Sequence, residues 1–321
     1  MKHLALGKVP IRVLNSSFLR LTGARSGAMV TPPRAGLDFA ALKAGGKYLV
    51  ISADPVTGVV EGIGRYAISV SANDVATSGN RPQFAESVVL LPENADARYA
   101  GRIAAQMDAE ARRLGITIVG GHTEVTPDLK RPIIAVTAFS FVDRYVSSDG
   151  ARAGDTMMMT KTAGIEGTAV LTGEKEFLDD ISVVSEAVSA FATGHVHAIH
   201  DCTEGGVLGA AFEMSLASGV GFELREGSVP VAPKTLSLCR RKGLDPLRLI
   251  GSGSILLSVE RGKEEAVRRA VAPVMATKVG SFTRAGRHLV TRGGRSMAVR
   301  SAPVDELWRA LGGSSGAGHG T

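Results

Sequence analysis

Apolar and polar positions alternate with two different periods along the first half of the chain, and these periods predict alternating strands and helices. The clearest helix is predicted over residues 96–114, where apolar side chains recur every three or four residues opposite a charged face. A second helical spacing, of small and apolar residues, covers 62–78. Short apolar runs typical of buried strands occur at 48–52, 84–91, 116–119 and 133–142.

The second half of the chain repeats this alternation. Strands are predicted at 156–160, 255–259 and 278–282, and helices at 181–191, 205–218 and 263–271. The stretch between the two halves, 147–154, consists of small, polar and charged residues, so we interpret it as a domain boundary.

This order of elements predicts two α+β domains of similar size rather than one large sheet. We expect one domain over residues 1–148 and a second over 149–311. The last ten residues are nearly all Gly, Ser and Ala, which predicts a disordered tail over 312–321.

Length and composition agree with a two-domain globular protein. The chain has 321 residues, of which 44% are hydrophobic and 21% charged. Cys202 and Cys239 cannot build a disulfide framework, which favours a reducing, cytoplasmic location. The most apolar stretch, 132–142, has about half of the ~20 residues that a membrane-spanning helix needs. We therefore expect a cytoplasmic protein with no membrane segment.

The net charge of +6 changes this interpretation little. The basic residues are scattered, and only 5% of the residues are aromatic, whereas nucleic-acid binders usually combine a basic stripe with aromatic side chains. Nucleic-acid binding is therefore not expected. The excess charge suits a solvated surface and some affinity for small anions.

Four polar clusters, each beside a glycine or a turn, are candidates for chemistry. They contain Asp38, Asp54, the pair Asn73 and Asp74, and the run 120–124. Three aspartates that converge from separate elements can bind Mg²⁺ together with phosphate oxygens. A strand that runs into two glycines can cradle phosphate with bare backbone N–H groups. Each cluster alone is equally compatible with turn or capping roles, in which Asp and Asn are favoured.

The order of these clusters makes the sequence similar to a known superfamily, over about residues 36–282. The motifs that carry the resemblance are Gly36-Leu-Asp38, Ser52-Ala-Asp-Pro-Val-Thr-Gly58, Asn73-Asp-Val-Ala-Thr-Ser-Gly79, Gly120-Gly-His-Thr-Glu-Val125, Gly150-Ala-Arg-Ala-Gly-Asp155, Thr160-Lys-Thr-Ala-Gly-Ile-Glu-Gly167, Asp201-Cys-Thr-Glu-Gly-Gly-Val207 and Gly251-Ser-Gly-Ser-Ile255. The sequence resembles the superfamily of aminoimidazole ribonucleotide (AIR) synthetase, hydrogenase maturation protein HypE, selenophosphate synthetase and thiamine-monophosphate kinase. The second-domain motifs are most similar to HypE and its archaeal-type relatives.

The resemblance implies an α+β, AIR-synthetase-like fold with two domains. The N-terminal domain would form a homodimer through a shared β-barrel, and the C-terminal domain would be an α/β sandwich. ATP and Mg²⁺ would lie in the cleft, and phosphoryl transfer would activate an oxygen or another nucleophile of the substrate. Catalysis of this kind depends mainly on positioning and charge neutralisation.

The resemblance also implies roles for individual residues. The expected metal ligands are Asp38, Asp54 and Asp74. The expected nucleotide contacts are Asn73, Gly120, Gly121 and Thr123 from the first domain and Asp201 and Thr203 from the second. The candidate catalytic residues are Asp74, His122 and Glu124.

The sequence departs from HypE at several positions. HypE ends in a cysteine that carries its carbamoyl group, whereas this sequence ends Gly318-His-Gly-Thr321 and has no cysteine after Cys239. His122 and Glu124 replace the Asp and Lys of the Gly-Gly-Asp-Thr-Lys motif, Leu37 replaces an acidic residue, and 251–254 lacks an acidic residue often found in HypE. We therefore expect a retained nucleotide site without the terminal-cysteine chemistry.

Three functions are compatible with these observations. The first is ATP-dependent activation of an oxygen-bearing group on a small or protein-bound acceptor that the sequence does not identify. The second is a small-molecule kinase that resembles thiamine-monophosphate kinase, and the third is a nucleotide-binding partner protein without turnover. A zinc site at His195, His197 and His200 is a weaker alternative, because structural zinc needs four committed ligands, and we expect His200 to orient the loop at Asp201 instead.

Overall fold

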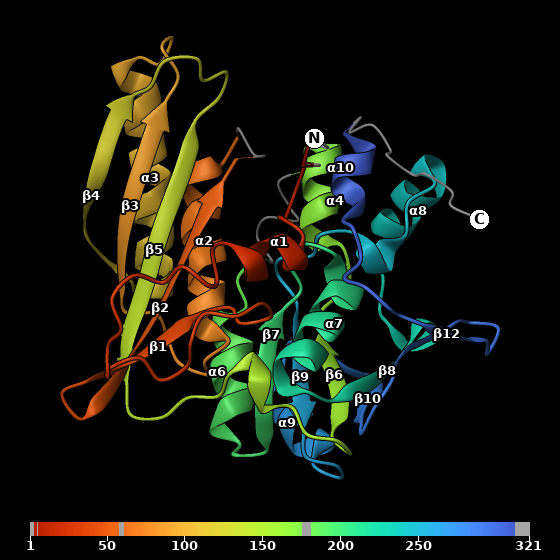
Figure 1. Cartoon of the computed structure of the whole chain (residues 1–321). Helices are drawn as coiled ribbons and strands as arrows, with labels where there is room; N and C mark the ends of the chain where they lie inside the picture. The colour runs from red at the N-terminus through yellow and green to blue at the C-terminus, as the bar shows by residue number, and fades with distance from the viewer. Residues whose placement is uncertain (1–2, 5, 58–60, 175–180, 312–321) are drawn as a thin grey trace.

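The first domain contains a five-stranded sheet covered on one face by two helices (Figure 1). The computed structural model describes residues 3–4, 6–57, 61–174 and 181–311. After the short helix α1 (Ile11–Ser16), the sheet has the order β1-β2-β5-β3-β4, with β3 and β4 parallel and the other pairs antiparallel. Its strands are β1 (Ala40–Ala44), β2 (Lys47–Val56), β3 (Phe84–Leu91), β4 (Thr117–Val125) and β5 (Ile133–Val142). The covering helices are α2 (Ile63–Ala76) and α3 (Ala97–Leu114).

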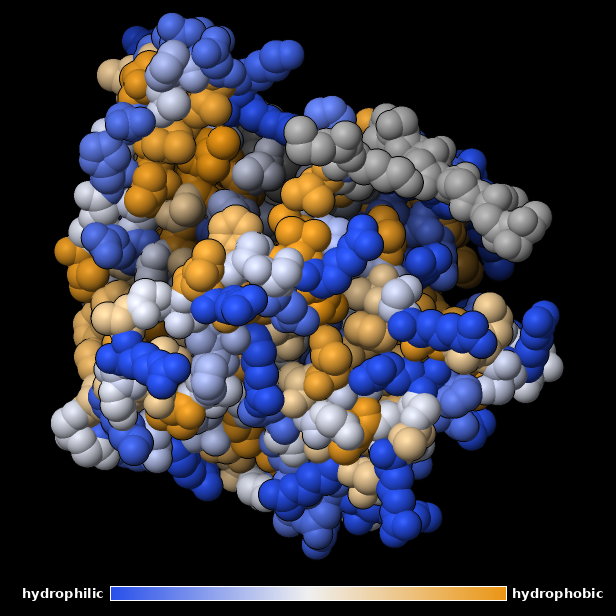
Figure 2. All heavy atoms as spheres, viewed as in Figure 1, coloured by the Kyte–Doolittle hydropathy of each residue, from blue (hydrophilic) through white to orange (hydrophobic). Residues whose placement is uncertain are grey.

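The two faces of this sheet differ because successive strand side chains point to opposite sides. In β5 every second side chain from Ile134 to Val142 is buried under α2. The alternate side chains face away from the helices, and Phe141 and Val88 are 42% and 40% exposed there. Figure 2 shows hydrophobic atoms gathered over the upper part of this face, which we call the open face.

The second domain contains a seven-stranded sheet with helices on both faces (Figure 1). The strand order is β12-β11-β8-β10-β6-β9-β7. The strands are β6 (Thr156–Thr160), β7 (Val196–Asp201), β8 (Gly221–Arg225), β9 (Ile255–Val259), β10 (Ala276–Thr283), β11 (Arg287–Val290) and β12 (Ser296–Ala298). The helices are α4 (Ile165–Thr172), α6 (Val184–Ala192), α7 (Gly206–Ser218), α8 (Pro233–Lys242), α9 (Glu264–Val271) and α10 (Glu306–Ala310), with 3₁₀ turns at Ser148–Gly150, Glu226–Ser228 and Pro246–Arg248.

The two domains share one apolar core. Residues of α2 pack in the same buried cluster as α6, α9 and one face of the second sheet, while α7 covers the opposite face. The side chain of Asn73 locks this junction, because its Nδ2 donates to Ile181 O at 2.8 Å and its Oδ1 accepts from Val183 N at 2.9 Å. The relative position of the two domains is therefore fixed by buried contacts.

The elements with the clearest periodicity agree with the sequence-based expectation. Strands β3 and β5 have the predicted bounds, and α3 begins directly after Asp96, which accepts a capping hydrogen bond from Tyr99 N at 2.7 Å. The predicted strand at 116–119 is too short, because β4 continues through both glycines to Val125. The predicted tail, 312–321, lies outside the described residues. Within the described ranges, no helix is long and apolar enough to cross a membrane.

Candidate functional site

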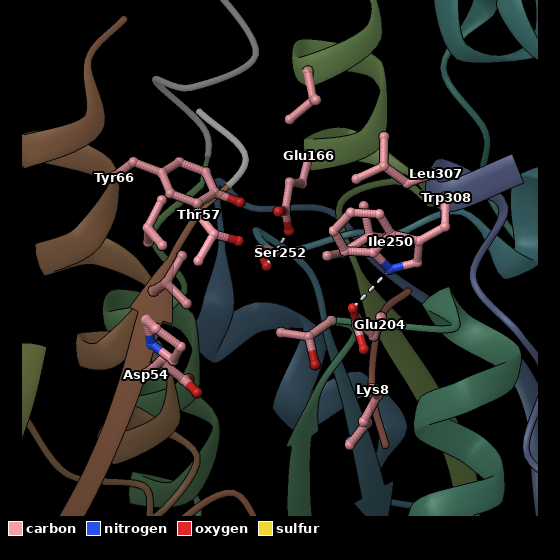
Figure 3. Close-up of a pocket in the computed structure, with 16 residues that line it drawn as sticks. Lys8, Asp54, Thr57, Tyr66, Glu166, Glu204, Ile250, Ser252, Leu307 and Trp308 are labelled. Atoms are coloured by element: carbon pink, nitrogen blue, oxygen red, sulfur yellow. Dashed lines mark hydrogen bonds between the residues drawn. The ribbon is translucent and has the colours of Figure 1, made fainter. Parts of the chain in front are cut away.

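A cavity of about 500 Å³ lies between the two domains, and we call it the interdomain cleft (Figure 3). The first domain contributes β2 and α2 to its walls, while the second contributes α4, the turn after β7, the segment before β9, and α10. Its lining residues are Gly7, Lys8, Asp54, Pro55, Val56, Thr57, Tyr66, Val70, Glu166, Val170, Thr203, Glu204, Ile250, Ser252, Leu307 and Trp308.

Carboxylates from both domains converge beside this cleft. Asp54 on β2 and Asp74 on α2 meet Asp201 at the end of β7, and burial together with these neighbours raises the pKa of Asp74 well above its usual range. The Ser52 hydroxyl lies 2.7 Å from Asp74 Oδ2 and 2.8 Å from the carbonyl oxygen of Asp38. One hydroxyl proton cannot serve two acceptors, so a protonated Asp74 completes this hydrogen-bonded chain.

Asp201 shows that this cluster is electrostatically incomplete. Its Oδ2 is buried and has no hydrogen-bond partner among the described residues, and burial, with Asp38 next in effect, raises its pKa. The described side chains do not form a closed metal cage, since no group of three His, Cys, Asp or Glu is assembled as one. A hard cation that arrives with its own phosphate and water ligands fits this arrangement, because it needs only part of its ligands from the protein.

Asp38 is held in a buried chain of ionic contacts. His200 contacts Asp38 through Nδ1, and its Nε2 lies 3.3 Å from Glu213 Oε2. Glu213 in turn lies 2.7 Å from Lys8 Nζ. Burial alone would lower the pKa of His200, but Asp38 and Glu213 raise it to about 10. Although burial acts in the opposite direction, His200 and Lys8 lower the pKa of Glu213 to about 2.

These ionic contacts show that the expected roles of the three histidines, in a zinc site or at the Asp201 loop, are wrong. His200 binds Asp38 and Glu213, so it does not act mainly on the loop at Asp201. His195 and His197 pair with two other carboxylates, Glu260 at 3.1 Å and Asp155 at 2.8 Å. The three histidines therefore have separate partners, and the described residues do not support the zinc alternative.

The other predicted nucleotide contacts differ in position. Thr203 lines the cleft, and its contact with a nucleotide stays a prediction. The two polar atoms of the Asn73 side chain both hydrogen-bond to the segment 181–183, so its effect on phosphate binding would be indirect.

Cys202 is buried, and burial raises the pKa of its thiol, which is the behaviour of an unreactive core cysteine.

The run 120–124 lies away from the aspartates within one chain. Asp54 and Asp74 lie on the helix-covered side of the first sheet, whereas His122 pairs in register with Val88 of the open face. The His122 and Glu124 side chains are 64% and 48% exposed and lie 3.1 Å apart. Their catalytic role therefore remains a prediction that requires another molecule to cover the open face.

Local packing explains Gly121 without a phosphate. Its φ is +152°, and a Cβ there would lie 2.0 Å from the carbonyl oxygen of Ser87 on the neighbouring strand. By contrast, a Cβ at Gly120 would meet only Glu86 Oε1, at 3.9 Å. The close approach of β3 thus requires one of the two glycines. Phosphate binding by Gly120, Gly121 and Thr123 stays a prediction.

A polar wall of the cleft was not identified from the sequence. Glu166 accepts a hydrogen bond of 2.5 Å from Ser252 Oγ, and the Tyr66 hydroxyl is directed toward the same space (Figure 3). Burial raises the pKa of Glu166 to about 7, although Ser252 and Tyr66 oppose this effect. The wall combines three elements that are distant in the sequence, and only the glycines beside Glu166 and Ser252 mark it in the sequence.

Comparisons with known proteins agree with the two-domain architecture. The family model "AIR synthase related protein, N-terminal domain" matches residues 36–142, and "AIR synthase related protein, C-terminal domain" matches residues 152–292. Carbamoyl dehydratase HypE of Escherichia coli (strain K12) is 28% identical over 287 residues, which cover 84% of this chain and 85% of that protein.

Solved structures of similar proteins share the fold. A crystal structure of hydrogenase maturation protein HypE in complex with ATP aligns with a TM-score of 0.73 at 24% identity, covering 94% of this chain and 93% of that one. A structure of AaThiL complexed with AMPPCP and TMP aligns with a TM-score of 0.67 at 21% identity, covering 83% and 90%.

The chain of contacts at His200 gives a prediction about stability. His200→Gln removes the cation between Asp38 and Glu213 and leaves two buried carboxylates under-compensated, so the free energy of unfolding should fall by about 3–5 kcal/mol. Urea unfolding at pH 7 measures this loss. His195→Gln is the matched control, since its exposed contact with Glu260 should contribute less than about 1 kcal/mol. Equal losses in the two variants would contradict the assignment.

The raised pKa of Glu166 gives a prediction about pH. The folded protein binds this proton more tightly than the unfolded chain, so the contribution of Glu166 to stability should fall as pH rises from about 4.5 to about 7. The decline relative to Glu166→Gln should reach at most about 3 kcal/mol. Urea unfolding of both proteins between pH 4 and 8 tests this, and parallel stability curves would show that folding leaves the pKa of Glu166 unshifted.

Proposed function

Because the chain belongs to the AIR synthase related protein family, we propose that it is an ATP-dependent enzyme that transfers the γ-phosphoryl group to an acceptor oxygen. The observation that carries the proposal is the convergence of Asp54, Asp74 and Asp201 from both domains beside the interdomain cleft. Carboxylates gathered in this way are electrostatically unfavourable alone, and they become favourable when a nucleotide-bound cation joins them.

Nucleotide binding is supported by the cleft and by the relatives. A cavity of about 500 Å³ has the size of small-molecule and cofactor sites. The similar structures are described as complexes of HypE with ATP and of AaThiL with AMPPCP. In this chain Thr203 and Thr57 line the cleft with hydroxyl groups, and Lys8 lines it while its Nζ is ion-paired with Glu213.

Asp54, Asp74 and Asp201 are the residues that would hold Mg²⁺, with Asp38 as a further candidate. When bound, the ion supplies neutralisation of phosphate charge. The unpartnered Asp201 Oδ2 and the raised pKa of Asp74 fit this role, since neither carboxyl group has a salt bridge among the described residues. His200 fixes the orientation of Asp38, while the buried domain junction holds the carboxylates at a constant separation.

The charges of the cleft bear on the choice between acceptors. Among the described lining residues, Lys8 is the one cation, whereas Asp54, Glu166 and Glu204 are acidic. This balance favours an uncharged acceptor, such as an amide or an alcohol, over a phosphate monoester. It therefore favours HypE-like activation of an oxygen-bearing group over a kinase that resembles thiamine-monophosphate kinase. A non-catalytic nucleotide-binding protein remains the third candidate.

We further propose that a second copy of the chain covers the open face to form a homodimer. The exposed Val88 and Phe141 lie on a sheet face that α2 and α3 leave uncovered (Figure 2). Large exposed apolar patches of this kind mark interaction sites. His122 and Glu124 would then lie at the subunit interface.

The metal proposal predicts mutual dependence of nucleotide and Mg²⁺. Each should raise the affinity for the other in the wild-type protein, as linkage requires. Asp74→Asn should keep the fold, because it is nearly isosteric with the protonated carboxyl group, and should weaken Mg²⁺-dependent ATP binding about tenfold or more, or ~1.4 kcal/mol. Calorimetric titrations with and without Mg²⁺ measure this, with exposed Asp143→Asn as the control. Equal affinity in all combinations would show that the aspartates have only a structural role.

The dimer proposal predicts a stable assembly that one charge disrupts. The wild-type protein should sediment as a dimer at micromolar concentration, since a real interface buries more than ~1,000 Å². Val88→Glu places a charge in the centre of the apolar face and should yield monomers, whereas Met275→Glu, in the second domain, should leave the dimer intact. A monomeric wild-type protein would exclude the homodimer.

A further inference from the structure

Three polar side chains from three elements meet on one wall of the interdomain cleft (Figure 3). Tyr66 belongs to the first turn of α2, Glu166 to the first turn of α4, and Ser252 to the segment before β9. Figure 3 shows the Tyr66 hydroxyl and the Glu166 carboxylate directed toward the same space, with Ser252 hydrogen-bonded to Glu166. In Figure 3 Tyr66 lies on the same side of the cleft as Asp54, whereas Glu166 and Ser252 come from the second domain.

The hydrogen bonds of this wall are incomplete. Tyr66 is only 3% exposed, and its hydroxyl lies close enough to Glu166 and Ser252 for these groups to affect its pKa, yet it has no partner within 3.5 Å and in hydrogen-bonding geometry in the described part of the chain. Glu166 is also buried, and Ser252 Oγ contacts its Oε2 at 2.5 Å. A buried polar group without a partner is unfavourable unless a ligand or water supplies one. A ligand with hydrogen-bonding groups could therefore supply the missing partner of the Tyr66 hydroxyl.

The backbone around the wall is tightly fixed. Gly167 N donates to Ile250 O at 2.9 Å, which ties the first turn of α4 to the segment that carries Ser252. A Cβ at Gly167 would lie 2.4 Å from the Leu249 side chain, so this close approach requires glycine. Glu166 and Ser252 are thus held on neighbouring, directly bonded segments, as groups that must act in one geometry need to be.

We propose that Glu166 accepts the proton of the acceptor hydroxyl or amide that attacks ATP, with Tyr66 and Ser252 as positioning residues. This inference rests on the proposed phosphoryl transfer. As the acceptor oxygen forms its bond to the γ-phosphorus, the bond from that phosphorus to the β–γ bridging oxygen breaks, and its electron pair leaves with ADP. The proton lost by the acceptor moves to Glu166 and then to solvent.

Glu166 suits this task better than the aspartates do. Asp54, Asp74 and Asp201 would be committed to the cation, whereas Glu166 comes from α4 and lies apart from Asp54 in Figure 3. A general base works best when its pKa is close to the working pH, and burial places the pKa of Glu166 at about 7. Among the described residues, the titratable groups with the largest effect on the pKa of Glu166 are Tyr66 and Asp305, and neither brings a positive charge; Lys8, which lines the same cleft, is paired with Glu213.

The first test measures proton exchange on binding of β,γ-methylene-ATP with Mg²⁺ at pH 7, by calorimetry in two buffers of different ionisation enthalpy. The anionic nucleotide should raise the pKa of Glu166, whereas the cation should release protons from Asp74 and Asp201 in every variant, so wild-type protein should take up a fraction of a proton per nucleotide more than Glu166→Gln does. Glu166→Gln should change the dissociation constant by less than about threefold. Exposed Glu265→Gln should exchange as many protons as the wild-type protein, because arginine contacts lower the pKa of Glu265 and keep it ionised.

The second test follows phosphate release from Mg²⁺–ATP with water as the acceptor. Wild-type turnover should rise with pH through an apparent pKa near 7, and Glu166→Gln should lose this limb and about 100-fold in rate, with partial recovery in Glu166→Asp. Tyr66→Phe should shift the apparent pKa without loss of nucleotide binding. If water does not react, the calorimetric comparison decides alone.

The outcomes separate this inference from the proposed function. Wild-type protein that does not bind the nucleotide would remove the proposed function itself. Nucleotide binding with the same proton exchange in wild-type protein and Glu166→Gln would overturn the role of Glu166 and leave phosphoryl transfer standing. Unchanged turnover in Glu166→Gln would overturn it equally.

Discussion

Four buried or half-buried aspartates lie around one domain junction, and His200 is the one salt-bridge partner that the described residues give them. His200 binds Asp38 and is kept charged by Asp38 and Glu213. Asp74 and Asp201 have no salt bridge among the described residues, and burial together with the neighbouring aspartates raises the pKa of both, although His200 and Lys8 act in the opposite direction on Asp201. In the absence of ligands, protons are the available means of reducing repulsion among such groups. A nucleotide that carries a divalent cation replaces those protons, so ligand and metal binding are coupled to the ionisation of the site.

The fold makes this crowding possible by fixing the carboxylates before any ligand binds. Asp54 lies on a central strand and Asp74 on the helix packed against it, so their separation depends on the packing of one sheet with one helix. Asp201 comes from the other domain, and its position depends on the core shared by α2 and α6. Asn73, next to Asp74, uses its whole side chain to hold this junction. The site is thus a product of domain packing and not of one flexible loop.

The sequence predicted the elements whose periodicity is strong, and missed features that arise from contacts between distant segments. The helix over 97–114 and the strands at 84–91 and 133–142 were predictable because their apolar spacing is regular. The strand β7 was missed because His197 and His200 interrupt its apolar pattern, although each has a buried or half-buried acidic partner. The aspartates were identified through the resemblance to a family. The pairing of Glu166 with Ser252 joins positions 86 residues apart, and in the sequence only the neighbouring glycines mark these two positions.

Successive side chains of a β-strand point to opposite faces of the sheet, so predicted site residues on opposite faces cannot act together within one chain. On β2 the side chain of Asp54 points toward α2, and its neighbours in sequence point to the open face. Register places His122 on that same open face beside Val88, so no side-chain rearrangement within one chain brings it to Asp54. If residues 120–124 contribute to a nucleotide site, that site must belong to another molecule that packs against the open face. The apolar character of that face and the polar His122–Glu124 pair at its edge are then parts of one interface, and catalysis by these two residues depends on assembly.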